Sequence, residues 1–284
     1  MILVTGSTGH LGNFVIEALL ESTQASQIIA AARSPEKAQD LAEKGVQVRE
    51  FDYDRPETMD AALEGVEKIL LISSSDVQDR VGQHRRVIEA AKRADVALIA
   101  YTSILDADNS QLMLAEDHKA TERMLRDSGL PWVFLRNGWY SENYFMDLEG
   151  TIDRGVMVGA AGDGRVSPAS REDYAQAAAA VLLRDGQEGK IYELAGDESL
   201  SYDEIAEAIA SVSGEEVVYK DLSREAYQSV LEGAGVPQGF AAVLADSDVG
   251  VSNGALDSES RDLHELIGRR TTPFIESVKE ALDK

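Results

Sequence analysis

The chain has 284 residues, which is enough for one large domain or two smaller ones at ~150 residues per domain. It carries 51 Asp and Glu against 27 Lys and Arg, a formal net charge of −24, which argues against binding to nucleic acid or to an anionic membrane surface. With no cysteine and only 4 histidines, the sequence excludes disulfides and thiolate sites, and it argues against a metal centre.

The first half of the sequence alternates short apolar runs with amphipathic stretches. We expect strands at Ile2–Thr5, Gln27–Ala32, Val46–Glu50, Lys68–Ile72, Ala97–Tyr101 and Trp132–Leu135. Helical patterns lie between them, at His10–Leu20, Pro35–Glu43, Glu57–Leu63, Val77–Arg93 and Leu114–Ser128. Short strands separated by helices indicate βαβ units, whose right-handed crossovers build a doubly wound parallel sheet. The predicted fold class is therefore α/β, of the Rossmann type.

From about Asn137 onward this alternation becomes less regular, and glycines become frequent. Further elements are expected as helices at Arg171–Leu183, Tyr202–Ser213, Arg224–Glu232 and Thr272–Leu282, and as a strand at Lys190–Leu194. We interpret the second half as a smaller α/β lobe that covers the carboxyl edge of the sheet. The predicted domains are residues 1–136 and residues 137–284, with the second lobe interleaved with the sheet.

The strongest local motif is Gly6-Ser7-Thr8-Gly9-His10-Leu11-Gly12, which directly follows the first strand and opens a helix. Glycines permit a tight turn and a close approach of the backbone to a pyrophosphate, and the helix N-terminus supplies N–H donors. The spacing is G-x-x-G-x-x-G rather than G-x-G-x-x-G, so the alternative is an ordinary connection with turn glycines. The position between strand and helix favours a dinucleotide-binding loop.

The end of the second strand indicates which dinucleotide binds. An Asp or Glu about 20 residues beyond the loop would bind the ribose 2′-hydroxyl and select NAD. This sequence has no acid there and has Arg33 instead, which can bind a 2′-phosphate, so we expect NADPH. The alternative is a surface arginine near a helix start. Asp52, after the third strand, can accept from the adenine amino group, or it can be a capping or loop residue.

The fifth strand ends at Tyr101, Thr102 and Ser103, which we expect to line the cofactor site. These features resemble the atypical short-chain dehydrogenases, whose ordinary catalytic relatives combine a serine, here Ser103, with Tyr-x-x-x-Lys on the next helix. That helix has His118 and Glu122 at the two positions instead. We interpret them as a salt link on the helix surface, with proton donation by His118 as the alternative.

The missing tyrosine and lysine bear on the reaction. Reduction of a carbonyl produces an alkoxide and needs a proton donor, whereas a quinone that accepts hydride becomes a stabilised hydroquinone anion. The sequence is therefore compatible with quinone reduction by orientation of the nicotinamide against the acceptor.

Four segments resemble the NmrA-like group, and closely the bacterial NADPH:quinone oxidoreductases of type 2. They are residues 66–75 (VEKILLISSS), 136–144 (RNGWYSENY), 159–164 (GAAGDG) and 244–250 (LADSDVG). The resemblance extends over essentially the whole chain. It implies NADPH as hydride donor, without zinc or flavin.

The resemblance also implies roles for individual residues. The ribose and phosphates would be lined by Ser73, Ser74 and Ser75, and the nicotinamide by Gly138 and Trp139. Positioning of the acceptor, the catalytic role, would fall to Asn137, Tyr140 and Asn143. Packing between lobes is the alternative for the aromatic residues Trp139, Tyr140 and Tyr144.

The resulting hypothesis is an NADPH-dependent quinone oxidoreductase that acts on a small quinone. The alternative is an NmrA-type redox sensor that binds NADP(H) with little or no catalysis. Because no Lys or Arg precedes Arg33, the sequence shows no signal peptide, and we expect a soluble cytoplasmic protein with no membrane or nucleic-acid partner. The oligomeric state stays open, with a homodimer as one option.

Overall fold

The computed structural model describes residues 1–76 and 78–283, and contacts divide the chain into two compact units. The first unit comprises Met1–Ala107, Asp117–Asn137 and Arg171–Tyr192, and the second comprises Asp108–Glu116, Gly138–Ser170 and Glu193–Lys284. The sequence analysis placed the division after residue 136. Residues 171–192 group with the first unit because their helix packs against the first helix of the chain.

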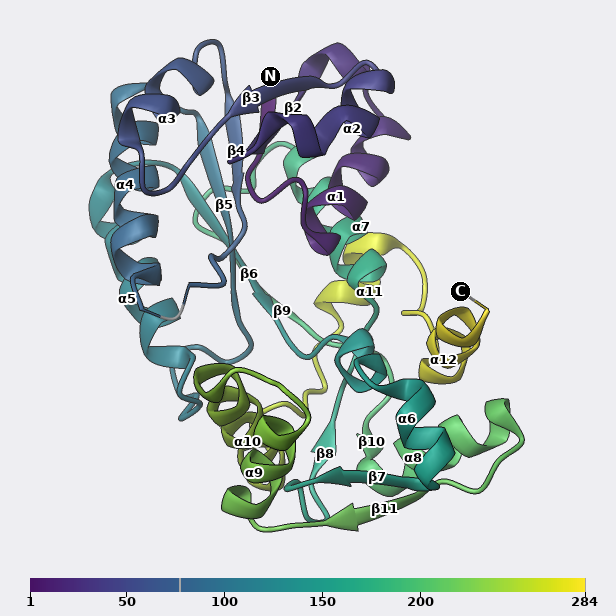
Figure 1. Ribbon diagram of the computed structural model, residues 1–284. Helices are drawn as coiled ribbons and strands as arrows, with labels where there is room; N and C mark the ends of the chain where they lie inside the picture. The colour runs from purple at the N-terminus through teal and green to yellow at the C-terminus, as the bar shows by residue number, and fades with distance from the viewer. Residues whose placement is uncertain (77, 284) are drawn as a thin grey trace. The chain divides into compact units, whose positions relative to one another are not determined.

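The first unit is built on a seven-stranded sheet with the order β3-β2-β1-β4-β5-β6-β9 (Figure 1). Its strands are β1 (Ile2–Val4), β2 (Ile28–Ala32), β3 (Gln47–Glu50), β4 (Lys68–Leu71), β5 (Leu98–Ile104), β6 (Trp132–Asn137) and β9 (Ile191–Leu194). The first six are paired in parallel, with Leu3 opposite both Ile29 and Ile69. β2 is buried along its whole length, as expected for a parallel strand covered on both faces.

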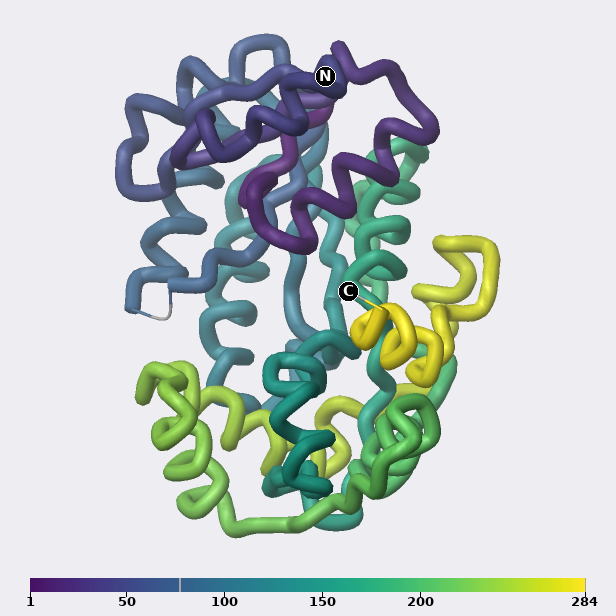
Figure 2. Tube along the Cα trace, turned by 45° about the vertical axis from the view of Figure 1, so that its right-hand side comes forward, coloured from purple at the N-terminus to yellow at the C-terminus, as the bar shows by residue number. Residues whose placement is uncertain are grey.

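Helices cover both faces of this sheet. On one face α1 (His10–Leu20) and α7 (Arg171–Leu183) pack against each other, although they are far apart in the sequence (Figures 1 and 2). On the other face lie α3 (Pro56–Ala62), α4 (Arg80–Arg93) and α5 (Ala115–Ser128) (Figure 1). Short 3-10 helices at Ala25–Gln27 and Pro35–Ala38 and helix α2 (Gln39–Glu43) complete the connections.

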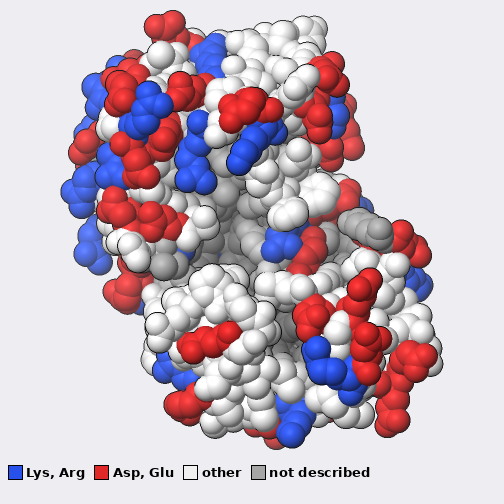
Figure 3. Space-filling view, viewed as in Figure 1, with Lys and Arg blue, Asp and Glu red and all other residues white. Residues whose placement is uncertain are grey.

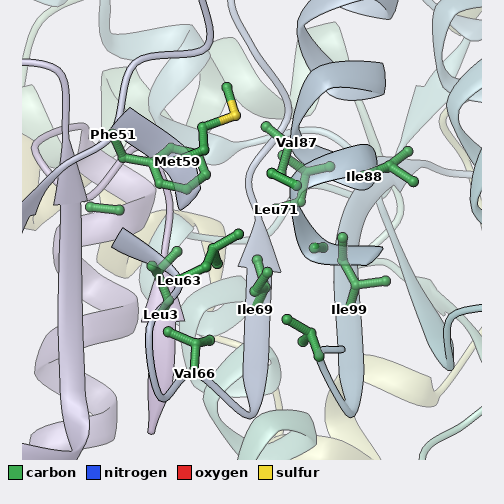
Figure 4. Packing of buried hydrophobic residues seen from close by; sticks show 14 of the residues in the cluster. Leu3, Phe51, Met59, Leu63, Val66, Ile69, Leu71, Val87, Ile88 and Ile99 are labelled. Carbon is green, nitrogen blue, oxygen red and sulfur yellow. The ribbon is translucent and has the colours of Figure 1, made fainter. Parts of the chain in front are cut away.

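Apolar side chains from the strands and from α3 and α4 form the core between the sheet and these helices (Figure 4). Fully buried members include Leu3, Met59, Ile69, Leu71, Val87 and Ile99. Burial of apolar surface stabilises the fold by ~25 cal/mol per Å². The core therefore fixes the sheet, whose carboxyl edge carries the polar residues described below.

Four predicted elements have boundaries that differ in the structure. β5 and β6 continue to Ile104 and Asn137 because the two strands stay paired to that point, so Ser103 lies inside a strand. The predicted helix Val77–Arg93 is observed from Arg80, and its first residue lies outside the described residues. The predicted helix Pro35–Glu43 is a 3-10 turn followed by a short α-helix.

The second unit contains two small sheets and several helices. The strands are β7 (Val156–Gly159), parallel to β11 (Val218–Asp221), and β8 (Arg165–Val166), antiparallel to β10 (Leu200–Ser201). The helices are the 3-10 helix η3 (Ser141–Phe145), α6 (Leu148–Arg154), α8 (Tyr202–Ser213), α9 (Arg224–Gly233), α10 (Gln238–Ser252), α11 (Asp262–Ile267) and α12 (Phe274–Leu282). Within the described residues, no helix is both long enough and apolar enough to cross a bilayer.

Candidate functional site

The loop between β1 and α1 is held in a tight conformation by its glycines. Gly6 has φ +59, a left-handed conformation that favours glycine, and its carbonyl accepts from the Gly9 N–H at 2.9 Å. A Cβ at Gly12 would lie 2.4 Å from the Gly6 carbonyl oxygen. Ser7 Oγ donates to the Ala31 carbonyl at 2.9 Å, which ties the loop to β2. Loop, helix start and β2 therefore have one fixed arrangement.

A cavity of about 450 Å³ in the first unit opens beside this loop. The structure brings together in its lining the predicted cofactor residues Gly6, Thr8, Gly9, Arg33, Asp52, Ser73, Ser74 and Ser75. Of the predicted loop residues, Ser7, His10, Leu11 and Gly12 are not among the described residues that line it. Ser7 and Gly12 instead support the loop from behind.

Cations and carboxylates both line this cavity. Arg33 and Lys37 are exposed on its wall, where either can bind a phosphate. Sequence analysis missed Lys37, although a second cation one helical turn after Arg33 was a usable signal. Asp52 Oδ1 accepts from the Asp54 N–H at 3.0 Å. This contact is typical of a loop residue, which was the alternative role for Asp52.

Ser74 in the cavity wall is held by three side chains of α4. Its N–H donates to His84 Nε2 at 2.9 Å, and its carbonyl accepts from Arg80 Nε at 2.7 Å. Its hydroxyl donates to Gln83 Oε1. These α4 residues are buried, so the main chain and hydroxyl of Ser74 have little freedom. We call Arg80, Gln83 and His84 the Ser74 clamp.

The Ser74 clamp extends away from Ser74 to other parts of the first unit. Gln83 Nε2 donates to Asp54 and Asp76, each at 3.2 Å, and both carboxylates line the cavity. His84 Nδ1 contacts Thr121 Oγ1 at 2.9 Å. Burial, and then the charge of Arg80, lowers the pKa of His84 to about 3, which keeps the ring neutral with Nε2 free to accept. The spacing of the clamp residues along α4 puts them on one helix face, a signal that sequence analysis did not use.

Tyr101, Thr102 and Ser103 line no part of this cavity among the described residues, and each has an internal partner. Tyr101 is fully buried, and its hydroxyl contacts His118 Nδ1 at 2.8 Å. Thr102 Oγ1 accepts from the Ser73 N–H at 2.8 Å. Ser103 donates to Glu122 Oε1 at 2.6 Å. Thr102 therefore supports the cavity wall through Ser73, whereas Tyr101 and Ser103 join β5 to α5.

The predicted surface salt link between His118 and Glu122 is wrong, because both side chains are buried. Glu122 is 1% exposed and accepts two hydrogen bonds from the Arg136 guanidinium, at 2.8 and 2.9 Å. Arg126 adds a further contact at 3.0 Å. Burial, and then the charge of Arg80, lowers the pKa of His118 to about 3, so its imidazole is neutral at physiological pH.

The residues predicted to position the acceptor are distributed over both units. Asn137 is the buried last residue of β6 in the first unit. Trp139 and Asn143 belong to the second unit, where they line a second cavity of about 840 Å³. Gly138 and Tyr140 also belong to the second unit but are not among the described residues that line this cavity. The backbone of Tyr140 forms an isolated parallel β-bridge with that of Ala169.

A metal ion has no evident ligand set here. Within the described part of the chain, no group of three or more His, Asp or Glu side chains is arranged to hold one.

The Ser74 clamp predicts a binding defect without a chemical defect. His84 does not contact the cavity itself, so replacing it with Leu should act by freeing Ser74. We expect the KM for NADPH to rise about fivefold to tenfold, the loss of one buried hydrogen bond, with kcat within about twofold. His84→Gln, which keeps an acceptor near the Nε2 position, should restore most of the affinity. Arg93→Gln, at an exposed ion pair on the same helix, is the control. Equal loss in the Gln and Leu variants would contradict the clamp.

The neutral buried histidines predict acid sensitivity. In the unfolded chain a histidine titrates near 6.5, whereas the pKa of folded His118 is about 3, so the unfolded state binds more protons between these values. The free energy of unfolding is therefore highest above about pH 6.5 and decreases as the pH falls. His118 alone accounts for a loss of ~2 kcal/mol at pH 5. Urea unfolding at pH 7.5 and 5.0 should show that His118→Asn, although less stable at pH 7.5, loses about 2 kcal/mol less than the wild type on acidification. Parallel losses in the two proteins would refute this assignment.

Comparison with known proteins gives the family. The chain matches the NAD(P)H-binding family over residues 6–185. It is 51% identical over 278 residues to Quinone oxidoreductase 2 of Escherichia coli, covering 98% of this chain and 97% of that protein.

The crystal structure of the NADPH-dependent quinone oxidoreductase of Escherichia coli complexed with NADPH matches with a TM-score of 0.96 and 50% identity over 99% of this chain and 100% of that one. The Citrobacter sp. triphenylmethane reductase complexed with NADP(H) matches with a TM-score of 0.95 and 41% identity over 99% of this chain and 100% of that one. These relatives confirm the predicted Rossmann-type fold and the resemblance, and the chain belongs to the NAD(P)H-binding family.

Proposed function

We propose that this protein is an NADPH-dependent quinone oxidoreductase. The observation that carries the proposal is the cavity of the first unit, in which the glycine loop and the cations Arg33 and Lys37 line one space. Quinone oxidoreductase 2 of Escherichia coli, similar over almost the full chain in sequence and in its crystal structure with NADPH, supports quinone as the acceptor and NADPH as the donor.

The cavity residues fit the groups of NADPH. The loop and the first turn of α1 offer backbone N–H groups to the pyrophosphate, and the glycines leave room for a close approach. Arg33 and Lys37 offer the charge that a 2′-phosphate requires. Asp52 stays our proposal for the adenine amino group, and Ser73, Ser74 and Ser75 for the ribose and phosphates. When bound, NADPH supplies the hydride.

The acceptor side depends on positioning more than on acid catalysis. His118 is neutral and contacts Tyr101, and Glu122 is engaged by Arg136, so the helix position used for proton donation in ordinary short-chain dehydrogenases has a structural role here. A quinone tolerates this, because its reduced anion is stabilised and can take a proton from solvent. We propose Asn137, Tyr140 and Asn143 as positioning residues, with Gly138 and Trp139 beside the nicotinamide.

The sensor alternative has less support, because the relatives named above that are 41% or more identical over almost the full chain are named as oxidoreductases or reductases. We further propose a cytoplasmic location and a small quinone as substrate. A homodimer is an option that sedimentation would resolve.

The cofactor assignment predicts a selective effect of Arg33. NADPH oxidation with a panel of simple quinones should be faster than NADH oxidation at equal concentration. Arg33→Ala should raise the KM for NADPH about tenfold to a hundredfold, since a charge-assisted hydrogen bond contributes ~1.5–3 kcal/mol, and should leave the KM for NADH unchanged. Lys37→Ala should have a smaller effect in the same direction.

The matched control is Lys44→Ala, which removes an exposed cation paired with Glu17 away from the cavity. An unchanged NADPH preference in Arg33→Ala would overturn the 2′-phosphate assignment. Tight binding of NADPH without turnover of any quinone would favour the sensor.

A further inference from the structure

The C-terminal part of the second unit is anchored on one buried carboxylate, that of Asp197 in the loop after β9. Figure 3 shows acidic side chains spread over the visible face, with basic ones among them. The side chain of Asp197 is instead only 2% exposed. Its Oδ1 contacts Arg261 Nη1 at 3.0 Å, and its Oδ2 contacts His264 Nδ1 at 3.0 Å. The same Oδ2 accepts from the Thr271 N–H at 2.7 Å, so three residues far along the chain converge on Asp197.

Two further hydrogen bonds extend this anchor to the start of α12. The Asp197 N–H donates to Thr271 Oγ1 at 2.8 Å, so these two residues are joined twice. Glu198 Oε2 accepts from the Phe274 N–H at 2.8 Å, which satisfies a donor in the first turn of α12 that has no acceptor within the helix. The position at which α12 begins is therefore set by Asp197 and Glu198. We call residues 261–274 the C-terminal latch.

Phe274, at the end of the latch, connects α12 to the 3-10 helix η3. Its side chain is 2% exposed. Its ring meets that of Tyr144 edge to face, with 5.7 Å between centroids and 82° between planes, and lies 5.6 Å from that of Phe145. Tyr144 also meets Tyr202 of α8 edge to face, at 5.5 Å and 89°. The ring of Tyr144 is thus held from two sides by contacts that contribute beyond their buried area.

Helix η3 depends on such neighbours for its conformation. A 3-10 helix has poorer hydrogen-bond geometry than an α-helix, so contacts with other elements count for more. At its start, the Ser141 N–H donates to the Ala169 carbonyl at 2.9 Å. At its end, its two aromatic residues lie against Phe274. Asn143 lies in the sequence between these two attachments.

We propose that Phe274 is a positioning residue for the acceptor, which acts through η3, and that Asp197 anchors the segment that presents it. The inference rests on the proposed function, in which Asn143 positions the quinone. Asn143 and Tyr144 line the cavity of the second unit, whereas Phe274 is not among the described residues that do so. Its influence therefore passes through η3 rather than through contact with a ligand. All of these residues belong to the second unit.

Hydrogen exchange measured by mass spectrometry tests the latch in the intact chain without NADPH or quinone. Phe274→Leu keeps an apolar side chain and removes the ring, so peptides that cover residues 138–146 should exchange about tenfold faster. Asp197→Asn keeps the shape of the side chain and removes the charge that Arg261 faces. This variant should speed exchange in the same peptides and in those that cover residues 271–276. Lys279→Gln, at an exposed ion pair on α12, is the control and should change neither.

Steady-state kinetics with menadione separates positioning from general destabilisation. Phe274→Leu and Asp197→Asn should each lower kcat/KM for menadione about tenfold, with the KM for NADPH within about twofold of the wild type, because a displaced positioning group costs rate at the acceptor alone. A double-mutant cycle tests the route. If Phe274 acts through η3, Phe274→Leu should cost about threefold or less in an Asn143→Ala background, since coupled residues are not additive.

The outcomes distinguish the latch from the proposed function. If the wild type does not turn over menadione with NADPH, the proposed function fails, and the exchange data still decide whether Phe274 holds η3. Unchanged exchange over residues 138–146 in both variants would overturn the latch. Faster exchange spread evenly over the second unit, an equal rise in the KM for NADPH, or an undiminished effect of Phe274→Leu in Asn143→Ala would also overturn it. Faster exchange confined to η3 and the latch, with a kinetic loss specific to the acceptor, would establish it.

Discussion

The site in the first unit depends on one close contact, between Gly12 at the start of α1 and the backbone of Gly6. Any side chain at residue 12 would meet the Gly6 carbonyl at 2.4 Å and Ser7 Cα at 2.8 Å, so the helix can approach the loop only because its third residue is a glycine. The same contact determines where the N–H groups of the first turn point. Ser7 fixes the loop from its other side through Ala31, so the anion-binding groups are ordered before any ligand arrives.

Behind the carboxyl edge of the sheet, buried polar groups hold α5 against the strands. Removing two charges from water is costly, and a buried pair is tolerated when its remaining donors and acceptors are satisfied. Glu122 meets this condition through Arg136, Arg126 and Ser103. The result is a rigid layer that connects α5 to β5 and β6, at the helix position where ordinary short-chain dehydrogenases carry the lysine of Tyr-x-x-x-Lys. This arrangement suits an acceptor that needs orientation more than acid catalysis.

Most of the first unit could be predicted from the sequence, because short apolar runs and amphipathic helices alternate there without interruption. The apolar runs predicted ends at Tyr101 and Leu135, before the observed ends of β5 and β6, since polar or charged residues such as Ser103 and Asn137 follow these runs. Their burial depends on partners such as Glu122, which only the folded chain brings near. The Ser74 clamp was missed for the same reason: its contacts join α4 to a loop.

In the second unit the sequence signal was weaker for a physical reason. Helix α10 contains Gly239 and Gly250 and is buried on more than one side, so its pattern lacks the single apolar stripe that marks a surface helix. The cavity was equally invisible, because its walls come from segments that are separate in the sequence. Sequence analysis nevertheless selected Trp139 and Asn143, which both line it.

Two of the buried carboxylates, Glu122 and Asp248, differ in how their charge is balanced. Glu122 is neutralised by guanidinium groups, so its field largely cancels within the first unit. Asp248 has its hydrogen-bonding capacity met by a hydroxyl and an amide, which hold it in place and leave its charge intact. Keeping an uncancelled charge among aromatic rings raises its pKa and opposes folding, and such perturbed groups gather at functional sites.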